Sequence, residues 1–336
     1  MKTYLLPENG QFYKANLHAH STVSDGAYTP EALKDIYKAK GYSVLAYTDH
    51  ELLVDHSDLT DENFLALTAF EYAFIEKEDY GVNRTVEFNL FAKDPHNTTQ
   101  VCFDPKYVMH GEKWRASVAK TVGEPFERVF TPECMQKVID AGRENGFLVS
   151  LNHPGYSMIT PEFFGNFQGL FAMEIYNHIS FISSGVDEYN PAMYEDMLRR
   201  GHRLFCIAAD DCHSGYPDTD HRCDRYGGFT MIKADSLEYG NIISALEKGN
   251  FYASRGPLIE ELYIEDGAIH LHCSPAKYVV MNTHYRGNRI SIAPEGENLT
   301  HVVFPVPGRN QNYFRFTVID ENGKQACTRA YFFDEL

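Results

Sequence analysis

Long apolar runs, an export signal and paired cysteines are all missing from this chain of 336 residues. No stretch of about 18 apolar residues occurs, and the first eight residues contain no sustained apolar segment, so we expect neither a membrane span nor an exported protein. The seven cysteines include no CxxC pair. An odd number of cysteines without a small disulfide framework favours reduced thiols and a cytoplasmic protein.

Positive charge is also scarce. The chain has 30 Lys and Arg against 47 Asp and Glu, a formal net charge of −17. Binding to a phosphate backbone depends on clustered Lys and Arg, so we expect no nucleic-acid partner. Carboxylates that hold divalent cations are locally neutralised, so the net charge overstates the local charge. The expected partner is a small-molecule substrate, and nothing in the composition indicates an oligomeric state.

Helical and strand patterns alternate over most of the first 255 residues. Thr29 and Thr131 each precede Pro and Glu and predict capped helices, which end at glycines and are followed by apolar strands. The segments 190–201 and 203–209 repeat this order, and 171–176 reads as a further buried strand. This alternation predicts an α/β fold with a parallel barrel or a doubly wound sheet.

The pattern changes after Gly256. Short alternating runs there contain Asp266-Gly267 and Asn322-Gly323, which are hairpin-turn pairs. We therefore expect two domains: residues 1–255, with a long active-site insertion at about 76–130, and a small β-sandwich at 256–336.

Potential metal ligands begin with His18 and His20, which lie two residues apart at the end of a probable strand and so share a face. Spacing alone is weak evidence, since His270 and His272 have the same spacing beside a hairpin, where a structural role is expected. The first pair differs because further acids and histidines follow other predicted strands directly. The C-terminal ends of parallel barrel strands converge at one mouth, so these residues predict a metal centre. They are Asp25, Asp49, His50, Glu71, His153, Asp210, Asp211 and His213.

Five motifs occur in an order that resembles the polymerase-and-histidinol-phosphatase (PHP) superfamily of metal-dependent phosphoesterases. They are HAHSTVSDG, LAYTDH, FEY, LNHPG and AADDCH, within about residues 16–215. The resemblance implies a distorted (β/α)7 barrel and metal-dependent hydrolysis. The segment GNFYASRGP and the β-rich tail resemble the carbaryl-hydrolase-like branch.

The resemblance also implies a ligand set for two or three divalent ions of zinc, manganese or iron. One metal would be held by His18, His20, Glu71 and Asp211; a second by Glu71 and His153; a third by Asp25, His50 and His213. Where the family often has another histidine, this chain has Asn89. Because an amide oxygen is a poorer zinc ligand than imidazole, the second site is expected to be weaker, to be completed by water or His110, or to prefer a harder ion such as Mn(II).

The expected nucleophile is a metal-bound water, whose pKa lies near ~7 in such sites, so no Ser or Cys nucleophile is required. The Cys212 thiol is an alternative without independent support. His178 is a candidate for protonating the leaving group, with a structural role as the alternative. Hydrogen bonds that hold the ligands in place are expected from Asp49, Asn89, Glu174 and Asp210, with a capping role as the alternative for the three acids. Candidate substrate contacts are Arg255 and Trp114, followed by Arg84, Arg115 and Arg225, each with packing as the alternative.

Three functions remain open. Phosphoester hydrolysis is favoured by the PHP resemblance, and hydrolysis of a carboxyl ester, amide or carbamate by the resemblance of the tail. The third is a non-catalytic metal-binding module. The nearly complete ligand set argues against this third function, because only the position of Asn89 departs from the pattern.

Overall fold

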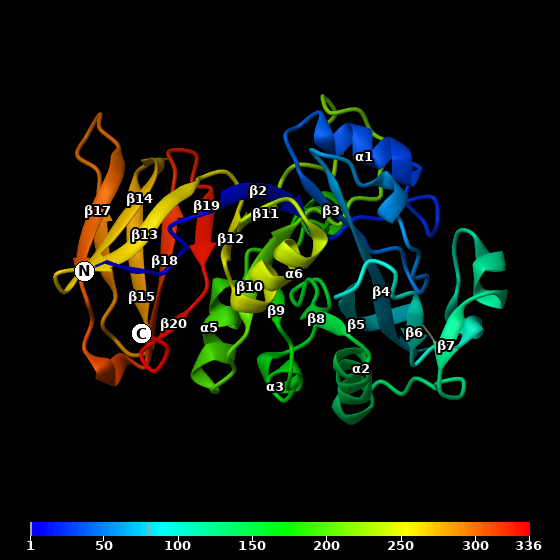
Figure 1. Cartoon of the computed structure of the whole chain (residues 1–336). Coiled ribbons are helices and arrows are strands. Elements are labelled where there is room, and N and C mark those ends of the chain that lie inside the picture. Colours follow the sequence, from blue (N-terminus) through cyan, green and yellow to red (C-terminus); the bar gives the residue numbers. More distant parts are fainter. Residues whose placement is uncertain (1, 79–80) are drawn as a thin grey trace.

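The computed structural model of the chain describes residues 2–78 and 81–336, and it has the mixed α/β fold predicted from the sequence (Figure 1). A 14-stranded sheet runs through most of the molecule, and a four-stranded sheet lies in its C-terminal part. The site depends on the first half of the large sheet, which bends into a ring.

Within the described residues, this ring contains seven strands. Strand pairing runs in the order β2, β3, β4, β5, β8, β9 and β10, and β5 runs antiparallel to both of its neighbours. An isolated parallel bridge between Ala19 and Cys212 then brings the ends of β2 and β10 together, with the Asp211 N–H donating to the His18 carbonyl at 2.9 Å. The strands are β2 (Gln11–Asn16), β3 (Val44–Tyr47), β4 (Leu65–Glu78), β5 (Gly81–Ala92), β8 (Phe147–Leu151), β9 (Ala172–Asn177) and β10 (Phe205–Ala209).

Apolar side chains fill much of the interior of the ring. Each ring strand contributes to one buried cluster, and α6 (Tyr239–Lys248) packs against it through Ile242 and Leu246. Contributors from the strands include Ala15, Val44, Leu67, Phe91, Leu148, Ala172 and Ile207. The ring is therefore a packed core rather than a pore.

Helices start where the sequence predicts them. Thr29 caps α1 (Pro30–Lys38) by accepting a hydrogen bond from the Ala32 N–H, and Thr131 caps α2 (Pro132–Glu144) in the same way. The other helices are α3 (Pro161–Phe164), α4 (His178–Ser184) and α5 (Pro191–Arg199), with short 3-10 turns η1 (Ser57–Leu59), η2 (Pro105–Tyr107), η3 (Lys113–Ser117) and η4 (Arg309–Gln311). In residues 2–78 and 81–336, none of the helices combines the length and apolar character needed to cross a membrane.

The regular alternation of strand and helix is interrupted in the first half. Only the short turn η1 lies between the parallel strands β3 and β4, and β4 pairs with β5 in antiparallel orientation. Antiparallel neighbours need no crossover helix, so none is required between β4 and β5. Ring strand β5 consequently lies inside the stretch 76–130, which continues with a small pair of parallel strands, β6 (Thr99–Val101) and β7 (Lys120–Val122).

Beyond the ring, the large sheet continues into the C-terminal part. β11 (Phe229–Ala234) pairs with β2, and β12 (Phe251–Ser254) pairs with β11 and with β19 (Gln325–Thr328). The remaining strands of this sheet are β15 (Tyr278–Thr283), β16 (Arg289–Ile292), β18 (Tyr313–Ile319) and β20 (Tyr331–Phe332).

The four-stranded sheet faces this continuation. It contains β1 (Thr3–Tyr4), β13 (Ile259–Glu265), β14 (Ala268–Ala276) and β17 (Leu299–Pro305). Side chains of both sheets form one buried cluster, and the N-terminal strand β1 lies in this part of the molecule (Figure 1). The predicted turns connect β13 with β14 and β18 with β19; Asp266 and Gly267 have φ values of 52° and 79°, as a tight hairpin turn requires.

Candidate metal centre

Polar side chains form the layer above the apolar core of the ring. Alternate residues of a strand share a face, so inward positions recur every second residue. On β4, Leu67 and Ala69 belong to the core and the next inward residue is Glu71; after β10, the series from Ile207 leads in the same way to Asp211. The alternation that places apolar side chains in the core therefore also places Glu71 and Asp211 in the interior of the ring.

Four ligand atoms converge at site A, which consists of His18, His20, Glu71 and Asp211. His18 Nε2 lies 3.2 Å from Glu71 Oε1 and 3.2 Å from Asp211 Oδ1. His20 Nε2 lies 3.1 Å from both His18 Nε2 and Asp211 Oδ1. All four residues are buried. Two imidazole nitrogens and two carboxylate oxygens around one point form a donor set that suits zinc and related divalent ions.

Site B consists of Glu71, Glu87 and His153. His153 Nε2 lies 3.1 Å from Glu87 Oε2 and 3.5 Å from Glu71 Oε1. Glu71 therefore belongs to sites A and B together. Glu87 was not among the ligands predicted from the sequence.

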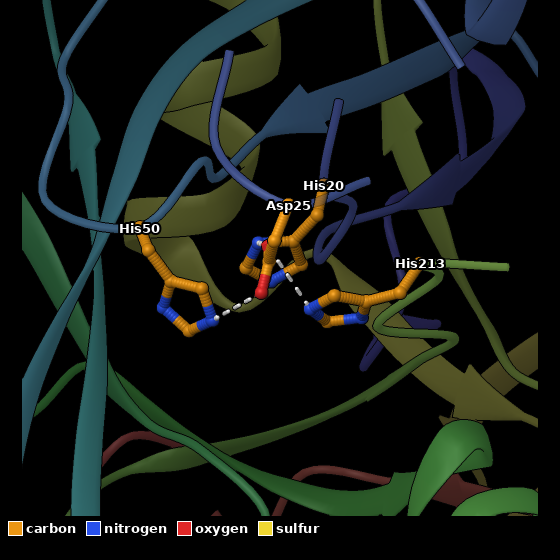
Figure 2. Close-up of side chains that lie close together, drawn as sticks. All are labelled: His20, Asp25, His50 and His213. Carbon is orange, nitrogen blue, oxygen red and sulfur yellow. Dashed lines mark ion pairs between the residues drawn. The ribbon is translucent and has the colours of Figure 1, made fainter. Parts of the chain in front are cut away.

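Site C consists of His20, Asp25, His50 and His213, and Figure 2 shows the three imidazole rings around the Asp25 carboxylate. Asp25 Oδ1 lies 3.5 Å from His20 Nδ1 and 3.4 Å from His213 Nε2, and Asp25 Oδ2 lies 3.8 Å from His50 Nε2. The side chains of Asp25, His50 and His213 are 29%, 23% and 25% exposed. Site C therefore faces the solvent side of the centre, whereas sites A and B are enclosed.

One buried oxygen atom in this region, Asn89 Oδ1 on β5, has no hydrogen-bond partner within the described part of the chain. A buried oxygen without a donor costs free energy unless a cation meets it. Asn89 lies opposite Glu71 in the pairing of β4 with β5. Together with the ligand atoms that converge at sites A, B and C, this oxygen indicates that the residues present fit divalent cations.

Protonation of the same residues supports this fit. Burial lowers the pKa of His18, but Asp211 and Glu71 outweigh burial and raise that pKa to about 10. Burial raises the pKa of Glu71, but His18 and His50 outweigh it and hold that pKa well below its usual range. In the absence of cations, protons therefore occupy this acid–base cluster at neutral pH, and a binding cation must displace them.

Glu174 holds two of the histidines in place. Its Oε1 accepts a hydrogen bond from His18 Nδ1 at 2.8 Å, and its Oε2 accepts one from the His153 backbone N–H at 2.9 Å. A proton on Nδ1 leaves the Nε2 lone pair of His18 directed at site A. This geometry is the one expected for a residue that orients a ligand.

Asp49 shapes the loop that carries His20 and Asp25. Its carboxylate accepts four hydrogen bonds, from the N–H and Oγ of Ser21 at 2.8 and 2.8 Å and from the N–H and Oγ of Ser24 at 3.0 and 2.8 Å. Asp49 contributes no atom to sites A, B or C and acts on them through this loop.

Asp210 ties the Asp211 loop to the start of β11. Its carboxylate accepts hydrogen bonds from the N–H groups of Tyr226, Gly227 and Gly228 and from the Tyr37 hydroxyl, at 2.7 to 2.9 Å. Burial raises the pKa of Asp210 to about 7, against the opposing effect of these donors. Asp210 therefore has a positioning geometry rather than a ligand geometry.

The backbone is strained at two ligand positions. His153 has φ of 22° and Asp211 has φ of 57°, in the left-handed region that residues with a Cβ rarely adopt. Such conformations cost about 1–3 kcal/mol each and persist where the surroundings enforce them. The enforcing contacts here are those of Glu174 with His153 and of His18 with Asp211.

His178 lies outside the three sites. It begins α4, and its Nδ1 lies 2.8 Å from the Tyr176 hydroxyl. Burial, together with the nearby charges of Arg255 and Lys324, lowers the pKa of His178 to about 4. The imidazole is therefore neutral at neutral pH, which works against its predicted role as a proton donor.

The predicted substrate contacts also lie apart from the ligand clusters. The Arg255 guanidinium stacks 4.1 Å from the Tyr176 ring centroid and donates to Gln325 at the seam between β12 and β19. Trp114 on η3 is 59% exposed and lies next to Arg115. The other arginines are held by protein groups: Arg84 by Glu76, Arg115 by Glu112, and Arg225 by the carbonyls of Ser214 and Tyr216.

Neither Cys212 nor the pair His270 and His272 is a ligand in sites A, B or C. Burial raises the pKa of the Cys212 thiol well above its usual range, which disfavours a thiolate nucleophile. His270 and His272 stack with His301 and Tyr263 on the four-stranded sheet, outside sites A, B and C.

A cavity of about 410 Å³ opens beside sites B and C. Asp25 and His50 of site C and Glu87 of site B line it. Arg128 also lines the cavity, but it is paired with Glu51 through two hydrogen bonds of 2.6 and 2.5 Å. The remaining lining residues are Ala73, Ile75, Lys77, Lys106, Tyr107, Met109 and His110. His110 therefore faces the cavity and belongs to none of the three sites.

Sequence reasoning missed three residues at the centre. Besides Glu87, Asn152 Nδ2 donates to Glu71 Oε1 at 2.7 Å, and Asn177 Nδ2 donates to Asp211 Oδ2 at 3.1 Å. Asn152 precedes His153 in LNHPG, and Asn177 ends a buried strand, so proximity to predicted ligands was the available signal. For Glu87 the signal was a charged residue two positions before Asn89 in an apolar strand.

The sequence matches no family model, and no curated protein matches it. Among solved structures, it is similar to a two-domain protein from Bacteroides vulgatus that contains a predicted PHP-like metal-dependent phosphoesterase. That similarity has 14% identity and a TM-score of 0.45, and covers 98% of this chain and 97% of that one. It is also similar to an amidohydrolase from Chromobacterium violaceum with bound sulfate and no metal, at 17% identity and a TM-score of 0.41, covering 62% of this chain and 93% of that one. At these TM-scores the likenesses carry no weight for function.

Proposed function

We propose that this chain is a metal-dependent hydrolase of the PHP superfamily, with phosphoesters as its favoured substrates. The observation that carries the proposal is the sharing of ligands: Glu71 belongs to sites A and B, and His20 belongs to sites A and C. Three clusters joined in this way suit two or three cations held close together, with a carboxylate between them to offset their repulsion. The five motifs in PHP order support the same proposal.

The chain's own residues would prepare the site for hydrolysis. Glu174 and Asp49 hold the imidazoles and the loop 20–25, and Asn152 and Asn177 hold the carboxylates of Glu71 and Asp211. The residues of sites A and B are buried in the ring. Divalent cations bound there supply an activated water and polarise the bond that it attacks. Because Cys212 is buried and protonated, we assign no covalent intermediate.

The cavity beside sites B and C is the proposed substrate pocket. Lys77 and Lys106 line it, and their ammonium groups can attract an anionic substrate, although Lys106 Nζ also lies 3.1 Å from Asp104. A phosphoester placed with its phosphorus at the cations would carry the rest of the molecule along Ile75 and Met109.

Hydrolysis of a carboxyl ester, amide or carbamate is the alternative. The Arg128 guanidinium in the cavity is already neutralised by Glu51, and the walls beside it are apolar, which suits a neutral substrate. The resemblance of the tail to carbaryl hydrolases points the same way. A non-catalytic module is less consistent with three intact ligand clusters beside an open cavity.

The finer fold assignment belongs to the same proposal. We infer that the ring is a distorted (β/α)7 barrel of the PHP type, that residues 256–336 form a β-sandwich, and that the protein acts in the cytoplasm on a small molecule. The closure of β10 onto β2 and the core shared by the two C-terminal sheets support these assignments.

The proposal is tested by adding Mn(II), Fe(II) or Zn(II) to metal-free protein and assaying phosphomonoesters, phosphodiesters and aryl carbamates side by side. We expect metal-dependent phosphoester hydrolysis that Glu71→Gln reduces at least a hundredfold, because it weakens two sites together. Glu76→Gln, on the same strand but outside the clusters, is the matched control. Activity confined to carbamates would contradict phosphoester hydrolysis and support hydrolysis of a carboxyl ester, amide or carbamate.

A further inference from the structure

Glu87 lies close to Asn89, the position at which the family often has another histidine. It lies two residues before Asn89 on β5, so both side chains share a face, and Ala73 and Glu71 oppose them on β4. The Glu87 carbonyl accepts a hydrogen bond from the Asn152 N–H at 3.0 Å, which brings Glu87 beside His153. Its carboxylate then lies 3.1 Å from His153 Nε2.

A simple ion pair between Glu87 and His153 does not account for the charges at this point. The Glu71 carboxylate lies 3.5 Å and Asp211 Oδ2 lies 3.8 Å from the same imidazole nitrogen. His153, Glu71 and Glu87 are 2%, 1% and 9% exposed. The carboxylates of Glu71 and Asp211 also lie within 3.2 Å of the two histidines of site A. Three enclosed carboxylates nevertheless meet at one imidazole nitrogen, and a cation between them would offset their mutual repulsion.

Asn89 is an independent observation. It is fully buried, its Oδ1 has no hydrogen-bond partner within the described residues, and it faces the ring interior opposite Glu71. Asn89 therefore places an amide oxygen without a donor on the same face of β5 as Glu87 and opposite Glu71, the residue that sites A and B share. Asn89 thus supports a cation without replacing the missing imidazole.

From these contacts we propose that Glu87 is a ligand of site B, and that this site therefore discriminates less against hard ions such as Mn(II) than sites A and C do. The inference rests on the proposed function for the presence of cations. Oxygen donors suit Mn(II) and Mg(II), whereas imidazole favours Zn(II). Sites A and C each contain at least two imidazoles, whereas site B contains one imidazole and two carboxylates.

The test is a titration of metal-free protein with Mn(II), followed by electron paramagnetic resonance of the unbound ion, and a competition with Zn(II). Glu87→Gln should bind one Mn(II) fewer than the parent protein, with the other sites retained. Glu87→His should keep the number of bound ions and raise the preference for Zn(II) over Mn(II) at one site by about tenfold or more. Glu76→Gln should match the parent protein in both measurements.

An unchanged Mn(II) count and affinity in Glu87→Gln would overturn the inference, as would an unchanged Zn(II) preference in Glu87→His. Circular dichroism shows whether each variant is folded. If Glu87→Gln does not fold, the Zn(II) preference of Glu87→His tests the inference. Both measurements use no substrate, so they are separate from the test of function. If Glu87→Gln binds one Mn(II) fewer but the parent protein hydrolyses no substrate, Glu87 is supported as a ligand and the proposed function is contradicted. If the parent protein hydrolyses phosphoesters but Glu87→Gln binds as many Mn(II) ions as the parent, the proposed function is supported and Glu87 is not a ligand.

Discussion

Glu71 is the residue on which both enclosed sites depend. One of its carboxylate oxygens faces His18 and His153, and the other faces His20 and His50. A shorter or neutral side chain cannot serve two clusters at once. Sites A and B thus share the Glu71 carboxylate as a ligand. Other residues hold the ligands in place without contributing a ligand atom.

Asp49 is the clearest of these supporting residues. Asp49→Asn places an amide where the carboxylate accepts hydrogen bonds from Ser21 and Ser24, so we expect the free energy of unfolding to fall by about 1–3 kcal/mol. The loop with His20 and Asp25 should loosen, and metal affinity at site C should fall about 10- to 100-fold. Chelator competition measures the affinity, and Asp58→Asn on an exposed position is the control. Unchanged affinity would show that the loop holds its shape without Asp49.

His178 predicts a pH dependence of stability. Its pKa is about 4 in the folded protein because of burial, against an ordinary value of 6.5. Between these pH values the unfolded chain takes up a proton that the folded protein does not, so this contribution is present above about pH 6.5 and is lost as the pH falls through that window. The loss amounts to at most about 3 kcal/mol.

Denaturant unfolding at pH 7.5 and pH 5 checks this contribution. His178→Gln should show a smaller loss of stability between the two pH values than the parent protein, and His221→Gln controls for removal of an exposed imidazole. An equal loss in the parent and in His178→Gln would refute the prediction.

At the scale of elements, the closure of the ring also depends on side-chain hydrogen bonds that join β10 to β11 and are not part of the strand pairing. Thr230 on β11 accepts a hydrogen bond from the Ala208 N–H at 3.2 Å and donates to the Ala208 carbonyl at 3.1 Å. Thr230→Val keeps the shape but removes both bonds, so we expect a loss of about 1–3 kcal/mol in unfolding free energy. Thr121→Val on exposed β7 should have little effect. If both variants were equally stable, Thr230 would not contribute to closure.

The elements show what sequence can and cannot predict. The helices after Thr29 and Thr131 were predictable because caps and terminating glycines act locally. The place of β1 in the C-terminal part and the bridge of Ala19 with Cys212 depend on pairing between distant segments. Glu87 was missed for the same reason, since its partner His153 lies beyond another helix, whereas the histidines and acids that directly follow strands carried a local signal.

At the scale of the whole molecule, the C-terminal part is attached to the ring by more than chain connectivity. Arg315 on β18 donates to Glu195 on α5 at 2.6 Å, and the Tyr313 hydroxyl donates to the same carboxylate at 2.7 Å. Both members of this ion pair are buried. Glu195→Ala should therefore cost about 3–5 kcal/mol, because it leaves the Arg315 charge unpaired.

Thermal unfolding measures this effect. Glu162→Ala removes an exposed partner of Arg200 and should leave the transition nearly unchanged. A parent-like transition in Glu195→Ala would indicate that the two parts are held together by the continuous sheet alone.

The most direct test of the metal centre is anomalous diffraction from crystals grown with Mn(II). The account predicts one peak among His18, His20, Glu71 and Asp211, and a second on the other side of Glu71 beside Glu87 and His153. Crystals that contain Mn(II) elsewhere but show no peak next to Glu71 would contradict it.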